Sequence, residues 1–156
     1  MTDDRTPVLA GGCQCGAVRY ALYATPERTG ICHCRMCQRA VGGPFFAATD
    51  VALEDFAWTR GAPKTYRSSS IAERTFCAAC GTPLSFRYLA EPRISITITS
   101  LDDPAAVTPA EQYAIESRLP WLDAALRAKG VRVADDPPPG GLDALVSHQS
   151  PEGAAR

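Results

Sequence analysis

All seven cysteines of this 156-residue chain lie in three short clusters with the spacings C-x-C, C-x-C-x-x-C and C-x-x-C. The three clusters are Cys13 and Cys15; Cys32, Cys34 and Cys37; and Cys77 and Cys80. Thiolates this close together oxidise readily when exposed and are costly to bury, unless a metal ion binds them. Zinc is the usual ion for thiolate ligands. The clusters therefore predict a zinc protein.

The first and third clusters suit a single closed site. Cys77 and Cys80 are separated by two residues, so both sulfur atoms can reach one tetrahedral ion. Cys13 and Cys15 point to the same face of an extended chain. A glycine follows each pair and suits a tight, positive-φ turn that directs backbone N–H groups at sulfur. We interpret these four cysteines as a structural zinc site, with redox pairs or free thiols as the alternatives.

The central cluster, Cys32, Cys34 and Cys37, supplies three ligands. A zinc ion with three protein ligands keeps an open position for substrate. Three thiolates make zinc a poor Lewis acid for ionising water, but such an ion can hold an incoming thiol as its thiolate. A bound thiolate is a strong nucleophile towards a small aldehyde. We interpret these three cysteines as a catalytic metal site.

Other interpretations of the central cluster stay open, because spacing alone does not say which cysteines share an ion. The cluster can instead form a second structural site, closed by His33 or by a water molecule. His33 lies between two cysteines in the chain, so its side chain is expected to face away from theirs. Three basic residues can offset thiolate charge or bind a substrate carboxylate, although a solvated side chain is the simpler interpretation for each: Arg35, Arg39 and Arg74.

Short alternating runs of apolar and polar residues predict a mainly β fold of roughly seven to nine short strands with little helix. The clearest run is residues 93–99, where three isoleucines share one face and hydroxyl side chains share the other. The best predicted helix is residues 121–129, and one or two helical turns are predicted for residues 34–40. The other predicted strands are residues 17–22, 31–34, 45–51, 64–67, 71–76, 84–89 and 112–116.

The composition is that of one globular domain, with 46% hydrophobic and 21% charged residues. We expect a flexible N-terminus over residues 1–7, a zinc-binding domain over residues 8–134 and a disordered tail over residues 135–156. The formal net charge of −1 provides no basic field for nucleic acid. The chain has no apolar run suited to a signal peptide or a membrane span, and reduced cysteines suit the cytoplasm. These features predict a cytoplasmic protein without nucleic-acid or membrane partners.

Longer stretches around the cysteines carry a more specific pattern. They are GGCQCGAVRY at residues 11–20, CHCRMCQR at residues 32–39 and FCAACGTPL at residues 76–84. Together they resemble the glutathione-dependent formaldehyde-activating (Gfa) family, which includes centromere protein V-like members. SLDDP at residues 100–104 and SRLPWL at residues 117–122 are similar to later stretches of those proteins.

The resemblance implies a β-tent fold of short antiparallel strands with two zinc ions per chain. By position, Cys13, Cys15, Cys77 and Cys80 match the structural ligands, and the other three cysteines match the catalytic ligands. The implied reaction is the addition of glutathione to formaldehyde, giving S-hydroxymethylglutathione, and the reverse reaction is that of a carbon–sulfur lyase. The implied partners are a glutathione-like thiol and an aldehyde, and the oligomeric state stays open, a homodimer included. The alternative is a non-catalytic zinc-binding module for protein interaction.

Overall fold

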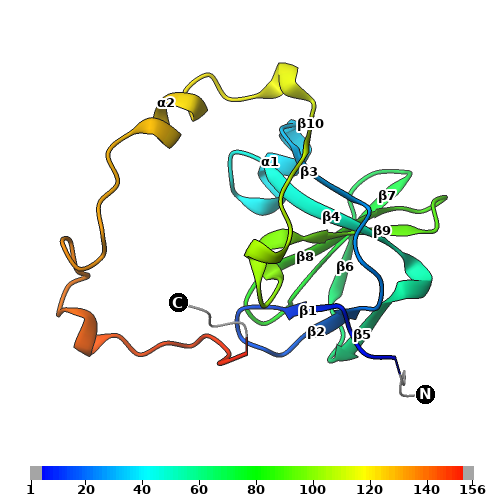
Figure 1. Ribbon diagram of the computed structural model, residues 1–156, viewed down its shortest axis with the longest axis horizontal. Coiled ribbons are helices and arrows are strands. Elements are labelled where there is room, and N and C mark those ends of the chain that lie inside the picture. The colour runs from blue at the N-terminus through cyan, green and yellow to red at the C-terminus, as the bar shows by residue number, and fades with distance from the viewer. Residues whose placement is uncertain (1–4, 153–156) are drawn as a thin grey trace.

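The computed structural model describes residues 5–152, and in this part of the chain ten short strands form two sheets. The smaller sheet has the order β1-β2-β5, with bounds Leu9–Gly12, Arg19–Leu22 and Phe56–Arg60. The larger sheet has the order β10-β3-β4-β9-β8-β7-β6, with bounds Glu111–Tyr113, Arg28–Cys32, Phe46–Ala52, Arg93–Thr97, Pro83–Tyr88, Ala72–Phe76 and Lys64–Arg67. Neighbouring strands are antiparallel except β10 and β3, which are parallel. The predicted mainly β fold is confirmed (Figure 1).

Helix is confined to short segments of the described chain. The α-helices are α1 (Arg35–Val41) and α2 (Leu122–Arg127). The 3₁₀ helices η1 to η5 are Leu53–Asp55, Ile98–Ser100, Pro104–Ala106, Ile115–Ser117 and Leu142–Ala144. None of the helices in the described residues is long and apolar enough to cross a membrane.

One hydrophobic core joins the two sheets. Tyr20 and Leu22 of β2 pack in the same buried cluster as Leu84 of β8 and Ile96 of β9. Burying an aliphatic side chain of this size contributes about 1.5–3 kcal/mol. Side chains alternate along a strand, so the core occupies one face of the larger sheet and leaves the opposite face for other uses.

Most predicted strands are present, and the differences lie at their ends. The run predicted for residues 93–99 is strand only to Thr97, after which the chain turns into η2, although Ile98 stays buried. The strand predicted for residues 112–116 ends at Tyr113, because Ala114 takes a left-handed conformation with a φ of 53°. The predicted helix at residues 121–129 is shortened to α2.

Strands β1 and β5 were not predicted as strands. The sequence of β1 is LAGG, which carries no apolar alternation. Its glycines are required by packing: a Cβ on Gly11 would lie 2.3 Å from the hydroxyl oxygen of Tyr20. The close approach of the Tyr20 ring therefore explains why this strand carries glycine in place of an alternating apolar pattern.

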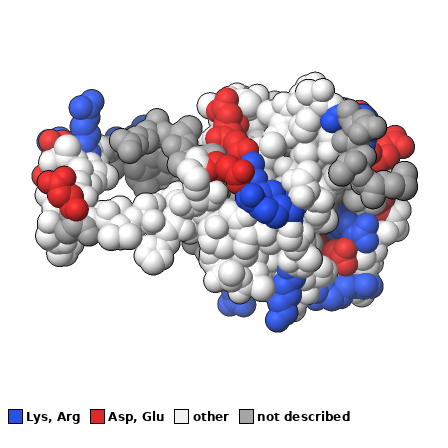
Figure 2. All heavy atoms as spheres, turned by 90° about the horizontal axis from the view of Figure 1, so that it is seen from below, with Lys and Arg blue, Asp and Glu red and all other residues white. Residues whose placement is uncertain are grey.

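After α2 the chain forms an arm that stands out from the sheets and then returns to them (Figures 1 and 2). We call residues 128–152 the C-terminal arm; apart from η5 it has no regular secondary structure. It rejoins the body near the turn between β1 and β2, where the Ser150 N–H donates to the Gln14 carbonyl oxygen at 2.7 Å. The predicted disorder of residues 135–156 stays a prediction.

Candidate active site and metal centres

The first and third cysteine clusters come together as one group of four. The Sγ atoms of Cys13, Cys15, Cys77 and Cys80 all lie within 4.8 Å of one another. Cys13 and Cys15 have their Sγ atoms 3.6 Å apart, and Cys15 and Cys77 have theirs 3.8 Å apart. A tetrahedron with zinc–sulfur bonds of about 2.3 Å has edges of about 3.8 Å. The four thiols therefore fit a closed tetrahedral zinc site.

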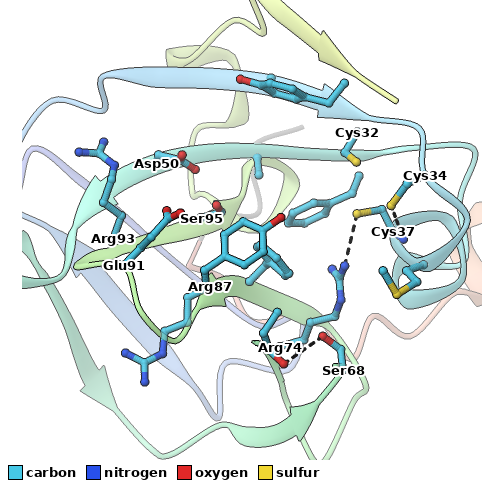
Figure 3. Close-up of a pocket in the computed structure, with 18 of the residues that line it drawn as sticks. Cys32, Cys34, Cys37, Asp50, Ser68, Arg74, Arg87, Glu91, Arg93 and Ser95 are labelled. Atoms are coloured by element: carbon cyan, nitrogen blue, oxygen red, sulfur yellow. Dashed lines mark hydrogen bonds between the residues drawn. The ribbon is translucent and has the colours of Figure 1, made fainter. Parts of the chain in front are cut away.

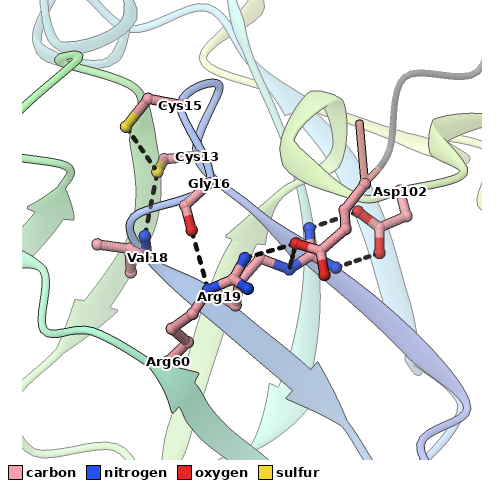
Figure 4. A network of polar contacts seen from close by, with 8 residues as sticks. Cys13, Cys15, Gly16, Val18, Arg19, Arg60 and Asp102 are labelled. Carbon is pink, nitrogen blue, oxygen red and sulfur yellow. Dashed lines mark hydrogen bonds and ion pairs between the residues drawn. The ribbon is translucent and has the colours of Figure 1, made fainter. Parts of the chain in front are cut away.

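The two turns that present these thiols have the same geometry. Gly16 and Gly81 have φ values of 77° and 78°, and their N–H groups donate to the carbonyl oxygens of Cys13 and Cys77 at 3.0 and 2.9 Å. The Val18 N–H donates to Cys13 Sγ at 3.2 Å (Figure 4). Backbone N–H groups directed at sulfur favour the thiolate over the thiol. The glycines predicted to form positive-φ turns do so.

This four-cysteine group connects the two sheets. Cys13 follows β1 of the smaller sheet, whereas Cys77 and Cys80 lie in the turn between β7 and β8 of the larger one. A nearby ion pair crosses the same region, because Arg19 of β2 donates to both carboxylate oxygens of Asp102, one of them at 2.7 Å (Figure 4). A metal ion held by the four thiols would fasten the sheets to one another.

The central cluster forms a second, separate group. Cys32 ends β3, Cys34 is the N-cap residue of α1 and Cys37 lies in the first turn of that helix. Their Sγ atoms lie within 4.8 Å of one another, and in the described residues no fourth Cys, His, Asp or Glu joins the group. The Cys37 N–H donates to Cys34 Sγ at 3.4 Å. The helix start thus turns two thiols towards a third at the end of a strand.

His33 lies outside this group. Its side chain is only 1% exposed, and its Nε2 atom lies 2.9 Å from the Oε1 atom of Gln112. Its ring contacts the Phe45 ring edge-on at a centroid distance of 5.9 Å. The imidazole of His33 therefore contacts Gln112 and Phe45 and is not one of the groups that could hold a metal ion with the three cysteines.

Arg74 is the predicted arginine that contacts the central cluster. Its Nη2 atom donates to Cys37 Sγ at 3.3 Å, and its guanidinium lies 4.7 Å from the centre of the Phe86 ring and 5.6 Å from that of Phe46. Arg35, by contrast, donates to Gln38, and Arg39 is exposed. Arg74 thus places a positive charge next to the thiols.

The environment of Cys37 favours a bound cation. Burial raises the pKa of the Cys37 thiol to about 12, although Arg74 works in the opposite direction. A thiol with so high a pKa stays protonated at neutral pH unless further positive charge stabilises its thiolate. A metal ion bound to all three thiols would supply that charge.

The three thiols open into a cavity of about 440 Å³. Its floor is the face of the larger sheet that points away from the core (Figure 3). Residues paired across antiparallel strands share a face. The pairs that line the floor are Cys32 with Phe46, Asp50 with Ser95, and Arg74 with Phe86. Phe46 and Phe86 make the cavity apolar near the thiols.

Charged groups gather at the opposite end of the cavity from the cysteines (Figure 3). We call Asp50, Glu91, Arg93 and Ser95 the polar end. None of these four residues was predicted from the sequence to belong to a site. Alternation along β4 could have placed Asp50 on the same face as Phe46. The strand that pairs with β4, and the register of that pairing, are set only by the tertiary structure.

The geometry defines a class of protein: a two-sheet β protein with two thiol clusters able to hold metal ions, one of them opening into a cavity. The glutathione-dependent formaldehyde-activating enzyme family matches residues 8–117 of this chain. The chain belongs to this family.

Two relatives and one solved structure are similar to the chain. An uncharacterised lyase of Schizosaccharomyces pombe is 34% identical over 82 residues, which are 53% of this chain and 59% of that protein. A protein of Halomonas elongata, named provisionally as a glutathione-dependent formaldehyde-activating enzyme, is 31% identical over 94 residues, 55% of this chain and 58% of its own length. The chain thus spans less than two thirds of either relative. A crystal structure of a Rhodobacter sphaeroides protein shares the fold, with a TM-score of 0.54 and 24% identity over 66% of this chain and 98% of that one.

Proposed function

We propose that this chain is a zinc-dependent carbon–sulfur lyase-type enzyme that acts on a thiol–aldehyde adduct. The substrates we propose are glutathione and formaldehyde, which combine to S-hydroxymethylglutathione. The observation that carries the proposal is the three-thiol group Cys32, Cys34 and Cys37, which faces a cavity of about 440 Å³. Family membership and the names of the two relatives support the same reaction class.

In the proposed reaction the substrate sulfur forms a bond to the aldehyde carbon. The π electrons of the carbonyl move to its oxygen, which takes up a proton, and the thiol loses one; the reverse reaction breaks the same carbon–sulfur bond. A zinc ion held by the three cysteines would supply the positive charge that keeps the substrate sulfur as a thiolate.

The protein's own groups prepare the site for this chemistry. Arg74 donates to Cys37 Sγ and offsets part of the negative charge of three thiolates. The rings of Phe46 and Phe86 flank the guanidinium and hold it in place. Their apolar surfaces also lower the polarity of the cavity lining near the thiols, which strengthens electrostatic interactions there.

The proposal is tested with Cys34→Ser. Cys34 is the N-cap of α1, and serine is a favoured N-cap residue, so the substitution removes a thiolate while keeping the helix start. Ala40→Ser, on the exposed part of the same helix, is the matched control. Zinc per chain is measured by elemental analysis and native mass spectrometry. The interconversion of glutathione, formaldehyde and their adduct is followed by NMR exchange spectroscopy.

We expect two zinc ions and accelerated exchange in the unaltered protein and in Ala40→Ser. Cys34→Ser should keep one zinc ion and lose the acceleration. Full turnover by folded Cys34→Ser would contradict the mechanism. Two zinc ions without any acceleration would instead favour a non-catalytic zinc module that binds protein partners.

A further inference from the structure

We infer that Gln38 is a positioning residue for the three-thiol group, and that it acts through one segment of chain, residues 111–117, which we call the clasp. The clasp contacts the chain on both sides of these cysteines, at the end of β3 and on α1. The inference rests on the proposed function of the same thiols and extends it to a side chain that does not line the cavity.

The three thiols need a common support because they come from two elements. Cys32 ends β3, whereas Cys34 and Cys37 lie at the start of α1. A helix of only seven residues depends on packing for its stability and its position. Of those seven residues, only Cys37 and Gln38 are buried. Gln38 is therefore the buried side chain, other than a thiol, through which α1 packs on its surroundings.

The clasp is attached on its strand side by both backbone and side-chain contacts. Strand β10, its first part, runs parallel to β3 and pairs Tyr113 with Cys32 (Figure 1). The His33 N–H donates to the Tyr113 carbonyl oxygen at 3.0 Å, and the buried His33 Nε2 atom lies 2.9 Å from Gln112 Oε1. The clasp is thus attached to the residue that lies between the first two thiols.

Gln38 attaches the clasp on its helix side. Its Nε2 atom donates to the Ser117 carbonyl oxygen at 3.2 Å, and its Oε1 atom accepts from Arg35 of the same helix. A glutamine amide supplies the donor and the acceptor that these two partners require. Its backbone N–H donates to the Cys34 carbonyl oxygen at 3.0 Å, and the residue directly follows Cys37. The position of Gln38 therefore sets that of the backbone that carries two of the thiols.

A tight turn joins the two attachments. Ala114 takes a left-handed conformation with a φ of 53°, which is uncommon for a residue other than glycine. The Ser117 N–H donates to the Ala114 carbonyl oxygen at 3.0 Å, so the turn closes on itself. The clasp therefore holds the end of β3 and the start of α1 at a set spacing. Sulfur ligands that share one ion require such fixed spacing.

The test replaces Gln38 by methionine, which has a similar length and volume but offers no N–H donor to the Ser117 carbonyl oxygen. Ala40→Met is the matched control, because it introduces the same side chain at an exposed position of the same helix. Each protein is loaded with cadmium, whose NMR signal reports the geometry of its sulfur ligands at each site separately. Competition with a chelator measures the zinc affinity of the three-thiol group.

We expect Gln38→Met to shift the cadmium signal of the three-thiol group and to weaken its zinc affinity by about tenfold, because a buried hydrogen bond is lost. The signal of the four-cysteine group should stay unchanged, as should both signals in Ala40→Met. A lower melting temperature with unchanged cadmium signals would show that Gln38 only stabilises the fold, and would overturn the inference.

A second variant, Gln112→Met, removes the side-chain contact on the strand side. Gln112 lies at an exposed position, so its replacement tests the clasp with little effect on folding. It should also shift the signal of the three-thiol group. If one clasp carries both effects, releasing either end frees it, and the double variant should lose little more zinc affinity than the stronger single variant. Losses that add in the double variant would overturn the inference.

These measurements need no substrate, so they are independent of turnover. A shifted three-thiol signal in Gln38→Met, in a protein whose unaltered form does not accelerate the exchange of glutathione and formaldehyde, would uphold the clasp while overturning the proposed function. Normal turnover by the unaltered protein beside an unshifted signal in both single variants would do the reverse.

Discussion

Arg74 is both packed against aromatic rings and placed beside the thiols of the proposed active site. Its guanidinium lies against two aromatic rings, which fixes its position, and it donates to Cys37 Sγ at 3.3 Å. Three thiolates on one divalent ion leave a net negative centre that repels an incoming thiolate. A fixed positive charge beside that centre reduces the repulsion. Because the residue is held by stacking as well as by charge, lysine is a poor replacement.

We expect Arg74→Gln to lower kcat/KM for glutathione by about tenfold, since hydrogen bonds to charged groups contribute about 1.5–3 kcal/mol. The number of zinc ions should stay at two. Arg74→Lys should recover only part of the loss. Steady-state rates from NMR exchange, beside metal analysis, provide the measurement, with exposed Arg39→Gln as the control. Unchanged kinetics in Arg74→Gln would show that the arginine serves packing alone.

At the scale of elements, the two cysteine groups are attached to very different parts of the fold. The group of three joins the end of β3 to α1, a helix of seven residues. Isolated helices this short are unstable in water, so α1 depends on its attachments. The group of four connects two sheets that already share a hydrophobic core. Loss of metal should therefore have local consequences at one site and wider consequences at the other.

We expect graded chelation to remove the metal of the open, three-ligand group first, because an open position admits a competing ligand. Backbone amides of residues 32–41 should then exchange faster with deuterium, while those of β2, β8 and β9 stay protected. Removing the second ion should increase exchange at the turns around Cys13 and Cys77 and lower the melting temperature. Hydrogen-exchange mass spectrometry at each zinc content is the measurement. Simultaneous loss of both ions with global unfolding would contradict this order.

At the scale of the whole molecule, the compact two-sheet body and the C-terminal arm differ sharply in how they are held. The arm exposes several apolar side chains, among them Val131, Val133 and Val146. Its return contacts are the Ser150 hydrogen bond to Gln14 and ion pairs of Glu152 with Arg60 and Arg19. On the face seen in Figure 2, acidic and basic side chains are interspersed. Exposed ion pairs of this kind stabilise a fold little.

A chain that ends at residue 134 should therefore keep its fold. We expect an unchanged zinc content, unchanged exchange kinetics and a melting temperature within a few degrees of that of the full chain. Calorimetry and metal analysis of the two proteins provide the comparison. A large loss of stability or of the four-cysteine metal would show that the returning arm protects that site.

Much of the fold could be predicted because strand patterning is local. The alternation in β9 placed Ile94 and Ile96 on a buried face, as the structure confirms. The ends of elements were less predictable, because they depend on single backbone conformations such as the left-handed Ala114. The strand β1 was not predicted because its glycines give no apolar alternation. They are required by the close approach of the Tyr20 ring of β2, which is a tertiary contact.

The sequence by itself determined which thiols lie close together along the chain, because short spacings hold the members of each cluster near one another. The structure then placed Cys13 and Cys15 beside Cys77 and Cys80 as one group of four. The cavity and its polar end were decided only by the tertiary structure. Asp50, Ser95 and Arg93 line the same cavity as the thiol cluster because β4 pairs with β9 in one register. A shift of one residue would turn their side chains to the core. Register depends on the packing of the whole core, and no stretch of sequence near these residues encodes it alone.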